Sequence, residues 1–301
     1  MSRLQYTNVK ICDDLGQGCF VPHVVVHPAP WNRSFSSSSR HRPLLEGIGA
    51  DILSLRQWND QHVLAPVFLA ALRGTCMRAG SGHRKIVVDV GAHVGLYSLY
   101  FAKRGCDVHA AEPLAHNALA IEQAAHDNRI GGDRLHVYRT LVGSHAGAVP
   151  LRYTLRKTDA THARHADRPR AIPEARSDWM ESRAFSMSLD ALVRRNAIGA
   201  PARAGVAPGT IDLLKVNAGG AELDVLQSAR IALRRTRWLL LAINPKAMPA
   251  GAVGRLQALL ERSRFRPWPV EGLTPWKWSD LTGRKPRSIN AALFRYNATT
   301  G

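Results

Sequence analysis

The chain has 301 residues, 45% of them hydrophobic, and a formal net charge of +18 at pH 7. This length and apolar content predict one large domain with an extension, or two small domains. No stretch approaches the roughly 20 apolar residues that cross a bilayer. The first 30 residues lack the basic start and apolar stretch of a secretory signal. We therefore expect a cytoplasmic protein without a transmembrane segment.

The positive charge has two explanations that the sequence leaves open. It can attract nucleic acid, an anionic membrane or an acidic substrate. It can also reflect an arginine-rich composition, because the basic residues are spread along the chain and no aromatics interleave with them as a stacking platform requires. We expect nucleic acid to be no more than a minor candidate partner.

The cysteine pattern argues against a metal centre. Cys12, Cys19, Cys76 and Cys106 are scattered, without a C-x-x-C pair. We therefore expect no zinc site and reduced thiols, with a bridge between Cys12 and Cys19 as a minor alternative.

Two segments precede the main motifs. Residues 1–50 are rich in Gly, Pro and Ser and predict a flexible extension, with a short strand at 24–26. The remainder, 51–297, forms the predicted domain. Residues 51–79 carry apolar side chains at helical spacing, interrupted at Pro66.

The chain is organised around residues 85–103. Residues 86–90 form a β-branched run typical of a strand buried on both faces, and Gly91, Gly95 and a helical pattern follow. Asp89 lies inside the apolar run, where a buried carboxylate needs a partner. A strand, a glycine turn and a helix bring backbone close to a nucleotide-like ligand. The spacing is not the G-x-G-x-x-G of dinucleotide enzymes, and an ordinary turn of another α/β fold remains the alternative.

The second and third strands follow. Residues 107–111 predict a strand that ends in Glu112, about 20 residues past the turn, where Rossmann-like folds bind ribose hydroxyls. Asn117 lies in the turn that follows or in the first turn of the next helix. The third strand is predicted at 135–138 and continues towards 141–142, with 149–153 as its hairpin partner.

Residues 155–184 interrupt this alternation and predict a loop insertion. His162 and His165 lie three residues apart there, and without further ligands nearby we interpret them as solvated. A short strand at 186–190 leads into a helix.

The last third again alternates. Strands are predicted at 211–216 and 237–243, and helices at 221–229 and 250–262. The closing strands, 264–270 and 290–296, can be antiparallel. Trp276 and Trp278 between them serve packing or a substrate platform.

Alternating strands and helices indicate an α/β fold with a mostly parallel sheet, whose ligands bind at the carboxyl ends of the strands. Asp89, Glu112, Leu141 and residues 215–217 all fall at such ends. Four separate stretches therefore predict one ligand site.

Together these motifs resemble those of the FkbM-type methyltransferases. The resemblance covers roughly 85–245 and rests on 88–98, on Glu112-Pro113 with Asn117, on 188–190, and on 212–222 with 225–226. It implies a Rossmann-like class I methyltransferase fold, with a mostly parallel seven-stranded sheet and helices on both faces. The implied reaction is methyl transfer from S-adenosylmethionine to a hydroxyl of a small molecule or glycan.

The resemblance also implies residue roles. The cofactor-binding positions are Asp89, Gly91, Ala92, His93, Gly95, Glu112, Asn117, Leu141 and Val142. Glu112 would bind the ribose, Asn117 would support that turn or contact the adenosine, and Leu141 and Val142 would lie near the adenine. The positions facing the methyl group and substrate are Lys215, Asn217 and Glu222.

The chain departs from the family at chemically important positions. The family's Asn in the turn is His93, and its two acids after the lysine are Asn217 and Gly219. The acid often found after the fifth strand is absent near 242–244. An amide cannot accept the proton that leaves a hydroxyl, although positioning alone can carry methyl transfer.

Two alternatives therefore stay open. The first is a weakened or non-catalytic relative that binds S-adenosylmethionine. The second is an RNA or protein methyltransferase, suggested by the charge. Against it, Asn244-Pro245 is followed by Lys246-Ala247 without the aromatic residue of amino-group methyltransferases.

Overall fold

The computed structural model describes residues 11–12, 19–20, 63–80, 82–154, 162–163, 179–199, 209–271, 273, 275–283, 286 and 288–297. Most of the predicted extension 1–50, its strand at 24–26 and the predicted helix before residue 63 lie outside these ranges. Within the extension, β1 (Ile11–Cys12) and β2 (Cys19–Phe20) pair antiparallel.

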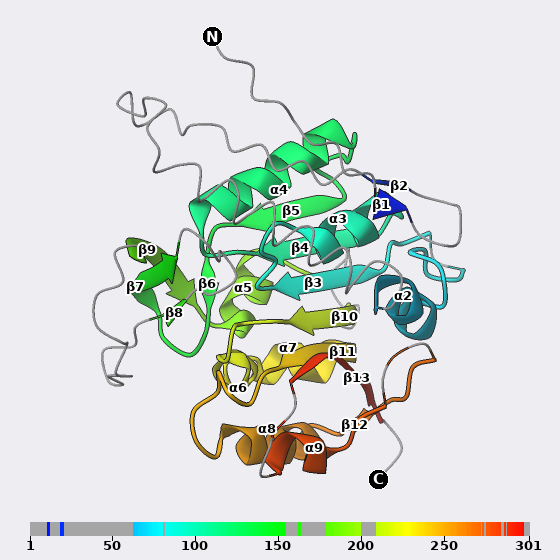
Figure 1. The fold of residues 1–301 in the computed structure, drawn as a ribbon. Helices are drawn as coiled ribbons and strands as arrows, with labels where there is room; N and C mark the ends of the chain where they lie inside the picture. Colours follow the sequence, from blue (N-terminus) through cyan, green and yellow to red (C-terminus); the bar gives the residue numbers. More distant parts are fainter. Residues whose placement is uncertain are drawn as a thin grey trace.

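A seven-stranded sheet forms the centre of the molecule (Figure 1). In spatial order its strands are β12 (Phe265–Pro267), β13 (Ile289–Tyr296), β11 (Thr236–Ile243), β10 (Ile211–Val216), β3 (Ile86–Val90), β4 (Asp107–Ala111) and β5 (Leu135–Tyr138). From β11 to β5 all neighbours are parallel, and β13 runs antiparallel to both β11 and β12. The mostly parallel seven-stranded sheet predicted from the sequence is confirmed, including the antiparallel closing strands.

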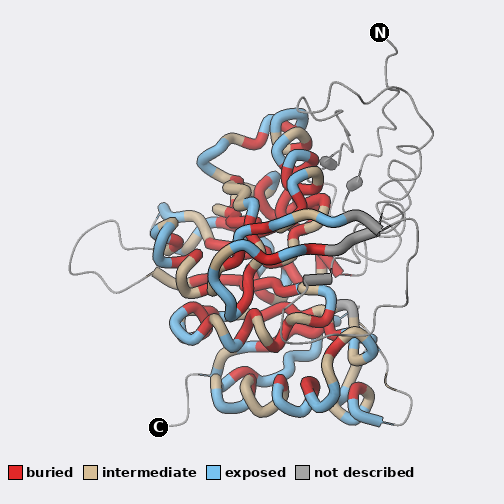
Figure 2. The backbone as a smooth tube through the Cα atoms, turned by 90° about the vertical axis from the view of Figure 1, so that its left-hand side faces the viewer, coloured by how far each residue is buried: buried red, intermediate tan, exposed pale blue. Residues whose placement is uncertain are grey.

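Helices cover both faces of this sheet, as predicted. One face packs against α2 (Ala65–Leu72), α3 (Leu96–Lys103) and α4 (Ala115–Asp127). The other packs against α5 (Leu189–Arg195), α6 (Glu222–Gln227), α7 (Arg230–Arg235), α8 (Ala252–Arg262) and α9 (Trp278–Thr282). Figure 2 shows the buried residues along the strands and on the helix sides that face them.

The first strand illustrates why the sequence folds this way. Successive side chains of a strand point to opposite faces. Val87 packs with α2 to α4, whereas Val88 and Val90 pack with the helices of the other face. A strand covered on both sides needs a continuous apolar run, and residues 86–90 supply it.

A second, four-stranded sheet corrects two predictions. Its strands, in order, are β6 (Leu141–Val142), β9 (Trp179–Met187), β7 (Gly147–Thr154) and β8 (His162–Ala163). β7 pairs antiparallel with β9, so the predicted hairpin with the third strand is wrong. The predicted loop at 155–184 is wrong at 162–163 and 179–184, which are strand. The rest of that segment lies outside the described residues.

One helix prediction also needs correction, and one helix was not predicted. The helix predicted to reach residue 79 ends at Leu72, because Arg73 and Gly74 adopt positive φ angles of 52° and 65°. A helix cannot continue through left-handed backbone. The helix predicted at 221–229 is confirmed as α6, whereas α7, which follows it, was not predicted because so short a segment shows no apolar period.

Trp276 and Trp278 are partly buried and pack against the core. Their rings meet edge to face at 5.3 Å, and both contact Phe294 of β13. The packing role, one of the two predicted, fits these contacts.

The expectation of reduced thiols is wrong for two of the four cysteines. Cys76 and Cys106 form a disulfide, with Cα atoms 4.6 Å apart, although 30 residues separate them. The bridge ties the segment after α2 to the residue that precedes β4. Within the described part of the chain, no helix is long and apolar enough to cross a membrane.

Candidate functional site

The strand ends that the sequence predicted to converge do meet. The amides of Gly91 and Ala92, just after β3, donate to the carbonyl of Ala111 at the end of β4. The amide of Glu112 donates to Tyr138 at the end of β5. The amide of Asn217, after β10, donates to Val90. Four carboxyl ends therefore form one continuous edge.

The glycine turn at this edge requires its glycines. Gly91 has a φ of 73°, and a Cβ there would lie 1.9 Å from the carbonyl oxygen of Asn217. Gly95 has a φ of 84°, and its Cβ would lie 2.8 Å from Ile121 of α4. Left-handed backbone and these close approaches both exclude a side chain. His93 also has a positive φ, 54°, so the turn places an imidazole where the backbone is strained.

Asp89 has the partner that its burial requires. Its Oδ1 lies 2.7 Å from Nζ of Lys215, its direct neighbour across β3 and β10. Its Oδ2 accepts a hydrogen bond of 2.7 Å from Ser98 of α3. Lys215 also donates to the carbonyl of Gly91 at 2.7 Å and lies over the ring of Tyr97. This buried group locks the glycine turn to the sheet and to α3.

On the β4 side of the turn, Glu112 accepts hydrogen bonds from three groups. Its Oε2 accepts from the amide of His93 at 2.9 Å, and its Oε1 accepts from the amide of Leu114 and the side chain of Asn117. Burial raises the pKa of Glu112 to about 7, and these hydrogen bonds with the charge of Lys215 oppose the rise. A carboxylate has about four acceptor positions, so Oε2 retains capacity for one further donor.

Asn117 adds a second acceptor beside this carboxylate. Its side-chain nitrogen is engaged with Glu112, but its Oδ1 is buried and has no hydrogen-bond partner among the described residues. A buried acceptor without a donor is costly in a folded chain. The pair can thus receive two hydroxyl donors from a ligand such as a ribose.

His93 of the glycine turn and His116 of α4 are both neutral near pH 7. Burial lowers the pKa of His93 to about 3, with the charges of Lys215 and His116 acting in the same direction. Burial also lowers the pKa of His116 to about 4. Neither ring carries a positive charge near neutral pH, so neither repels a cationic ligand.

Leu141 and Val142 lie in different surroundings. Leu141 packs with Leu114, which follows Glu112, and with Leu151 and Ala184 of the second sheet. That sheet therefore adjoins the same edge, as Figure 1 shows near the carboxyl ends of the strands. Val142 is buried in the core on the α5 to α9 face.

The three positions expected to face the substrate, Lys215, Asn217 and Glu222, differ in their exposure and contacts. Lys215 is buried in the ion pair with Asp89. Glu222 is buried, and its Oε1 accepts from the amides of Ala218 and Gly220, so it holds the loop after β10. Burial raises the pKa of Glu222. Asn217 alone is exposed at the strand edge.

Two residues that contact the buried pair of Asp89 and Lys215 were given no individual role from the sequence. Ser98 closes the hydrogen bond to Asp89, and Tyr97 stacks over Lys215. Both fall in the first turn of α3, directly after Gly95. Their position next to the glycine turn is the signal that points to them.

Comparisons with known proteins show likeness in overall fold. The sequence matches no family of known proteins and no curated protein. Among solved structures, the METTL16 MTase domain is similar at 11% identity and a TM-score of 0.41, over 78% of this chain and 68% of that one. A TehB-like SAM-dependent methyltransferase from Corynebacterium glutamicum is 11% identical at a TM-score of 0.41, over 84% and 97%. Magnesium protoporphyrin IX methyltransferase from Synechocystis PCC 6803, with bound SAM, is 11% identical at a TM-score of 0.44, over 83% and 84%.

Proposed function

We propose that this chain is an S-adenosylmethionine-dependent methyltransferase that acts on a hydroxyl of a small molecule or glycan, as its resemblance to the FkbM-type family implies. The observation that supports the cofactor most directly is the buried pair of acceptors at the end of β4. Glu112 and Asn117 stand beside a glycine turn that leaves no room for a side chain at Gly91 or Gly95. An adenosine-bearing ligand supplies the hydroxyl donors that these acceptors need.

The chain's part in cofactor binding follows from these contacts. Oε2 of Glu112 would accept one ribose hydroxyl, and Oδ1 of Asn117 would accept a second donor. Asp89 and Lys215 would act by holding the turn in place, because both are occupied with each other, with Ser98 and with Gly91. Leu141, which packs beside Leu114, would contribute an apolar side to the adenosine pocket.

S-adenosylmethionine supplies an electrophilic methyl group on a sulfonium. The acceptor oxygen forms a bond to that carbon as the carbon–sulfur bond breaks, and the hydroxyl proton must leave. Asn217 is exposed at the strand edge, where its amide can orient a hydroxyl but cannot take the proton. Solvent water would then receive it, and the rate would depend on alignment.

A second candidate function rests on the same residue. With an amide at 217 and a glycine at 219, the chain could bind S-adenosylmethionine without turnover. Asn217→Asp separates the two, because it restores a carboxylate at an exposed position without new bulk. Gly219→Glu is less suitable, since Gly219 has a φ of 60° and a side chain there is strained.

The experiment uses methyl-labelled S-adenosylmethionine and extracts of cells that lack this protein. We expect the wild-type chain to transfer label to a metabolite, and Glu112→Gln to transfer much less. Glu122→Gln, at an exposed position of α4 paired with Arg139, is the matched control and should behave like the wild type. Label transfer by Asn217→Asp but not by the wild type would establish the non-catalytic alternative. Equal transfer by the wild type and Glu112→Gln would exclude the proposed site.

A further inference from the structure

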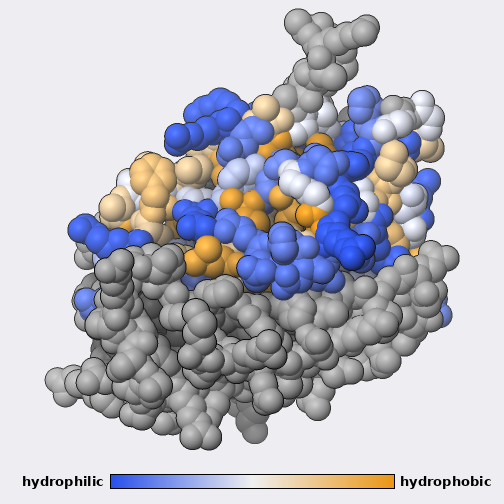
Figure 3. Space-filling model, turned by 90° about the horizontal axis from the view of Figure 1, so that it is seen from above, coloured by the Kyte–Doolittle hydropathy of each residue, from blue (hydrophilic) through white to orange (hydrophobic). Residues whose placement is uncertain are grey.

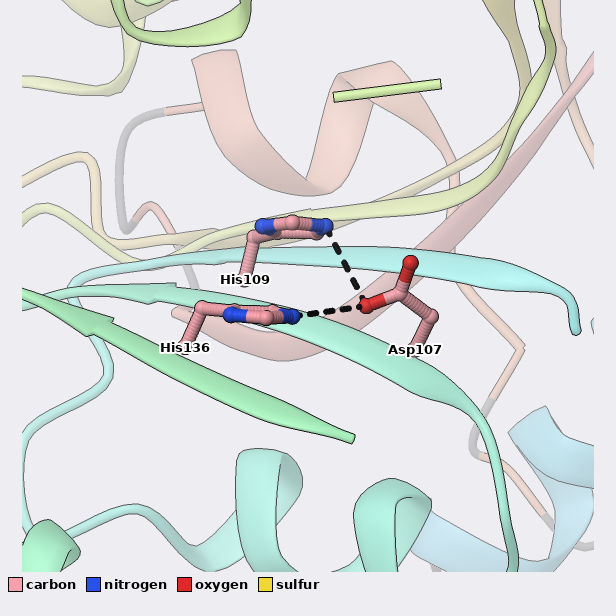
Figure 4. A group of neighbouring side chains, drawn as sticks. All are labelled: Asp107, His109 and His136. Carbon is pink, nitrogen blue, oxygen red and sulfur yellow. Dashed lines mark ion pairs between the residues drawn. The ribbon is translucent and has the colours of Figure 1, made fainter. Parts of the chain in front are cut away.

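Three potential metal ligands meet on the sheet at its amino end, well away from the turn. Asp107 and His109 lie two residues apart on β4 and so point to the same face. His136 of β5 is the direct neighbour of His109 across the two strands. Figure 4 shows both imidazoles directed towards the carboxylate of Asp107.

The distances between the nitrogen and oxygen atoms of these three side chains are close to those between the ligands of one metal ion. Nε2 of His109 and Nε2 of His136 each lie 3.3 Å from the same oxygen, Oδ1 of Asp107. All three ligand atoms lie within 4.8 Å of one another. Zinc bonds of about 2.0–2.1 Å in a tetrahedron place neighbouring ligand atoms about 3.4 Å apart.

The carboxylate of Asp107 contacts the two imidazoles only at ion-pair distance. Oδ1 of Asp107 is buried, and no group in the described part of the chain meets it with hydrogen-bond geometry, despite the two nearby imidazoles. A divalent cation between the three atoms would replace the two histidine contacts of this oxygen by a direct bond to the metal.

The surroundings orient one of the imidazoles. Nδ1 of His109 lies 2.9 Å from the hydroxyl of Tyr138, which follows His136 by two residues on β5. A partner at one ring nitrogen leaves the other for a metal, as in many zinc sites. The side chain of His109 is 7% exposed, and those of Asp107 and His136 are 29% and 37% exposed, so an ion can enter from solvent.

We propose that Asp107, His109 and His136 bind one zinc ion, with solvent at the fourth position. Two imidazoles and one carboxylate are ligands that zinc prefers, and three protein ligands with an open position are a known arrangement. The two rings lie stacked, 15° from parallel, so ligation requires them to turn towards one another. The half-exposed His136 has the freedom to do so.

The site is separate from the proposed methyl-transfer edge. Asp107 pairs with Ile86, the first residue of β3, and lies five residues before Glu112. At about 3.3 Å per residue, roughly 16 Å of strand separates the two. The ion would act as a clamp between β4 and β5. The sequence predicted no metal centre because ligands on neighbouring strands leave no short spacing motif.

The test is zinc binding by the full-length chain after treatment with a chelator. Zinc is titrated against a chromogenic competitor, and bound metal is counted by mass spectrometry. His136→Asn should lose one equivalent and weaken binding by more than about 100-fold, because removing an outer partner alone costs 10–100-fold. Tyr138→Phe should fall within that smaller range. His126→Asn is the matched control, because His126 is an exposed histidine whose imidazole lies 3.2 Å from Asp127.

Two further readouts keep the result unambiguous. Cobalt bound to the wild type should give the visible bands of four-coordinate cobalt, and these should be absent in His136→Asn and present in His126→Asn. Binding of S-adenosylmethionine should be the same in all variants. The proposal is overturned if the wild type binds no zinc, or if His136→Asn and His126→Asn bind it equally.

Discussion

Glu112 titrates in a range where cofactor binding can be measured. Burial raises its pKa to about 7, and only the ionised form accepts at both oxygens, which leaves Oε2 able to accept a ribose hydroxyl beside the amide of His93. Going from pH 8 to pH 6 lowers the ionised fraction of such a group about tenfold. We expect the affinity for S-adenosylmethionine to fall about tenfold over this range in the wild type. Glu112→Gln, which cannot titrate, should bind weakly with no such loss, and parallel pH profiles for the two proteins would refute this.

Glu112 also makes the stability of the fold depend on pH, in the opposite direction to the affinity for the cofactor. A pKa raised in the folded state means that the folded chain binds more protons than the unfolded chain between about pH 4.5 and 7. The contribution of Glu112 to stability is therefore complete below pH 4.5 and is lost as the pH rises through 7. Without cofactor, we expect the wild type to lose up to about 3 kcal/mol more than Glu112→Gln between pH 5 and 8. Urea unfolding at both pH values measures this difference.

Lys215 distinguishes a positioning role from a catalytic one. Removal of its charge leaves Asp89 buried and unpaired, and breaking such a pair costs about 3–5 kcal/mol. Lys215→Met should therefore unfold at much lower urea concentration. The double variant Asp89→Asn with Lys215→Met should recover part of that loss. A Lys215→Met protein of normal stability without turnover would instead identify a catalytic lysine.

Among the elements, the turn between β3 and α3 depends on the close approach of its backbone to the loop after β10. Gly91→Ala places a methyl group 1.9 Å from the carbonyl oxygen of Asn217. Gly105→Ala is the matched control, since Gly105 has a φ of 91° but nothing within 4 Å of its added Cβ. Both changes cost about 1 kcal/mol of backbone strain. Only Gly91→Ala should also weaken S-adenosylmethionine binding, and equal affinities in calorimetry would contradict the close approach.

The disulfide between Cys76 and Cys106 should contribute measurably to stability. It closes a loop of 30 residues, and chain entropy then predicts about 3–4 kcal/mol. Replacing both cysteines with alanine should lower the free energy of unfolding by about that amount. Reduced wild-type protein should approach the variant, and a variant as stable as the oxidised wild type would show that the bridge contributes nothing.

Element by element, the sequence predicted what depends on local pattern. The β-branched run at 86–90 predicted a strand and the pattern after Gly95 predicted a helix, and both formed as expected, as β3 and α3. The partner of β7 could not be predicted, because β9 begins 25 residues after β7 ends and no pattern marks the pairing. The disulfide escaped prediction for the same reason, since only the fold brings its two residues together.

At the scale of the site, the expected burial of Asp89 predicted that its carboxylate has a partner, but not which residue that partner is. Asp89 required a partner, but Lys215 lies 126 residues away and is placed by strand register. The convergence of strand ends was correct because parallel strands end at a common edge. Glu222 was expected to face the substrate, a role that remains a prediction, while its contacts hold the loop after β10.

At the scale of the whole molecule, the net charge of +18 calls for a test of its own. Figure 3 shows hydrophilic residues over much of the described surface at the α4 end, with smaller hydrophobic areas between them. Non-specific RNA binding should weaken steeply between 50 and 200 mM salt, by about 1,000-fold or more for many phosphate contacts. S-adenosylmethionine affinity should change little. RNA binding that survives high salt would favour an RNA substrate over a small hydroxyl acceptor.

The central claim is that the edge formed by the glycine turn, Glu112 and Asn117 binds S-adenosylmethionine. Calorimetric titration of the full-length chain at pH 8 tests it most directly, with Glu112→Gln as the site variant and Glu122→Gln as the control. We predict one site per chain, at least about tenfold weaker in Glu112→Gln and unchanged in Glu122→Gln, because a hydrogen bond to a charged group contributes about 1.5–3 kcal/mol. No binding by the folded wild type, or equal binding by the wild type and Glu112→Gln, would contradict the claim.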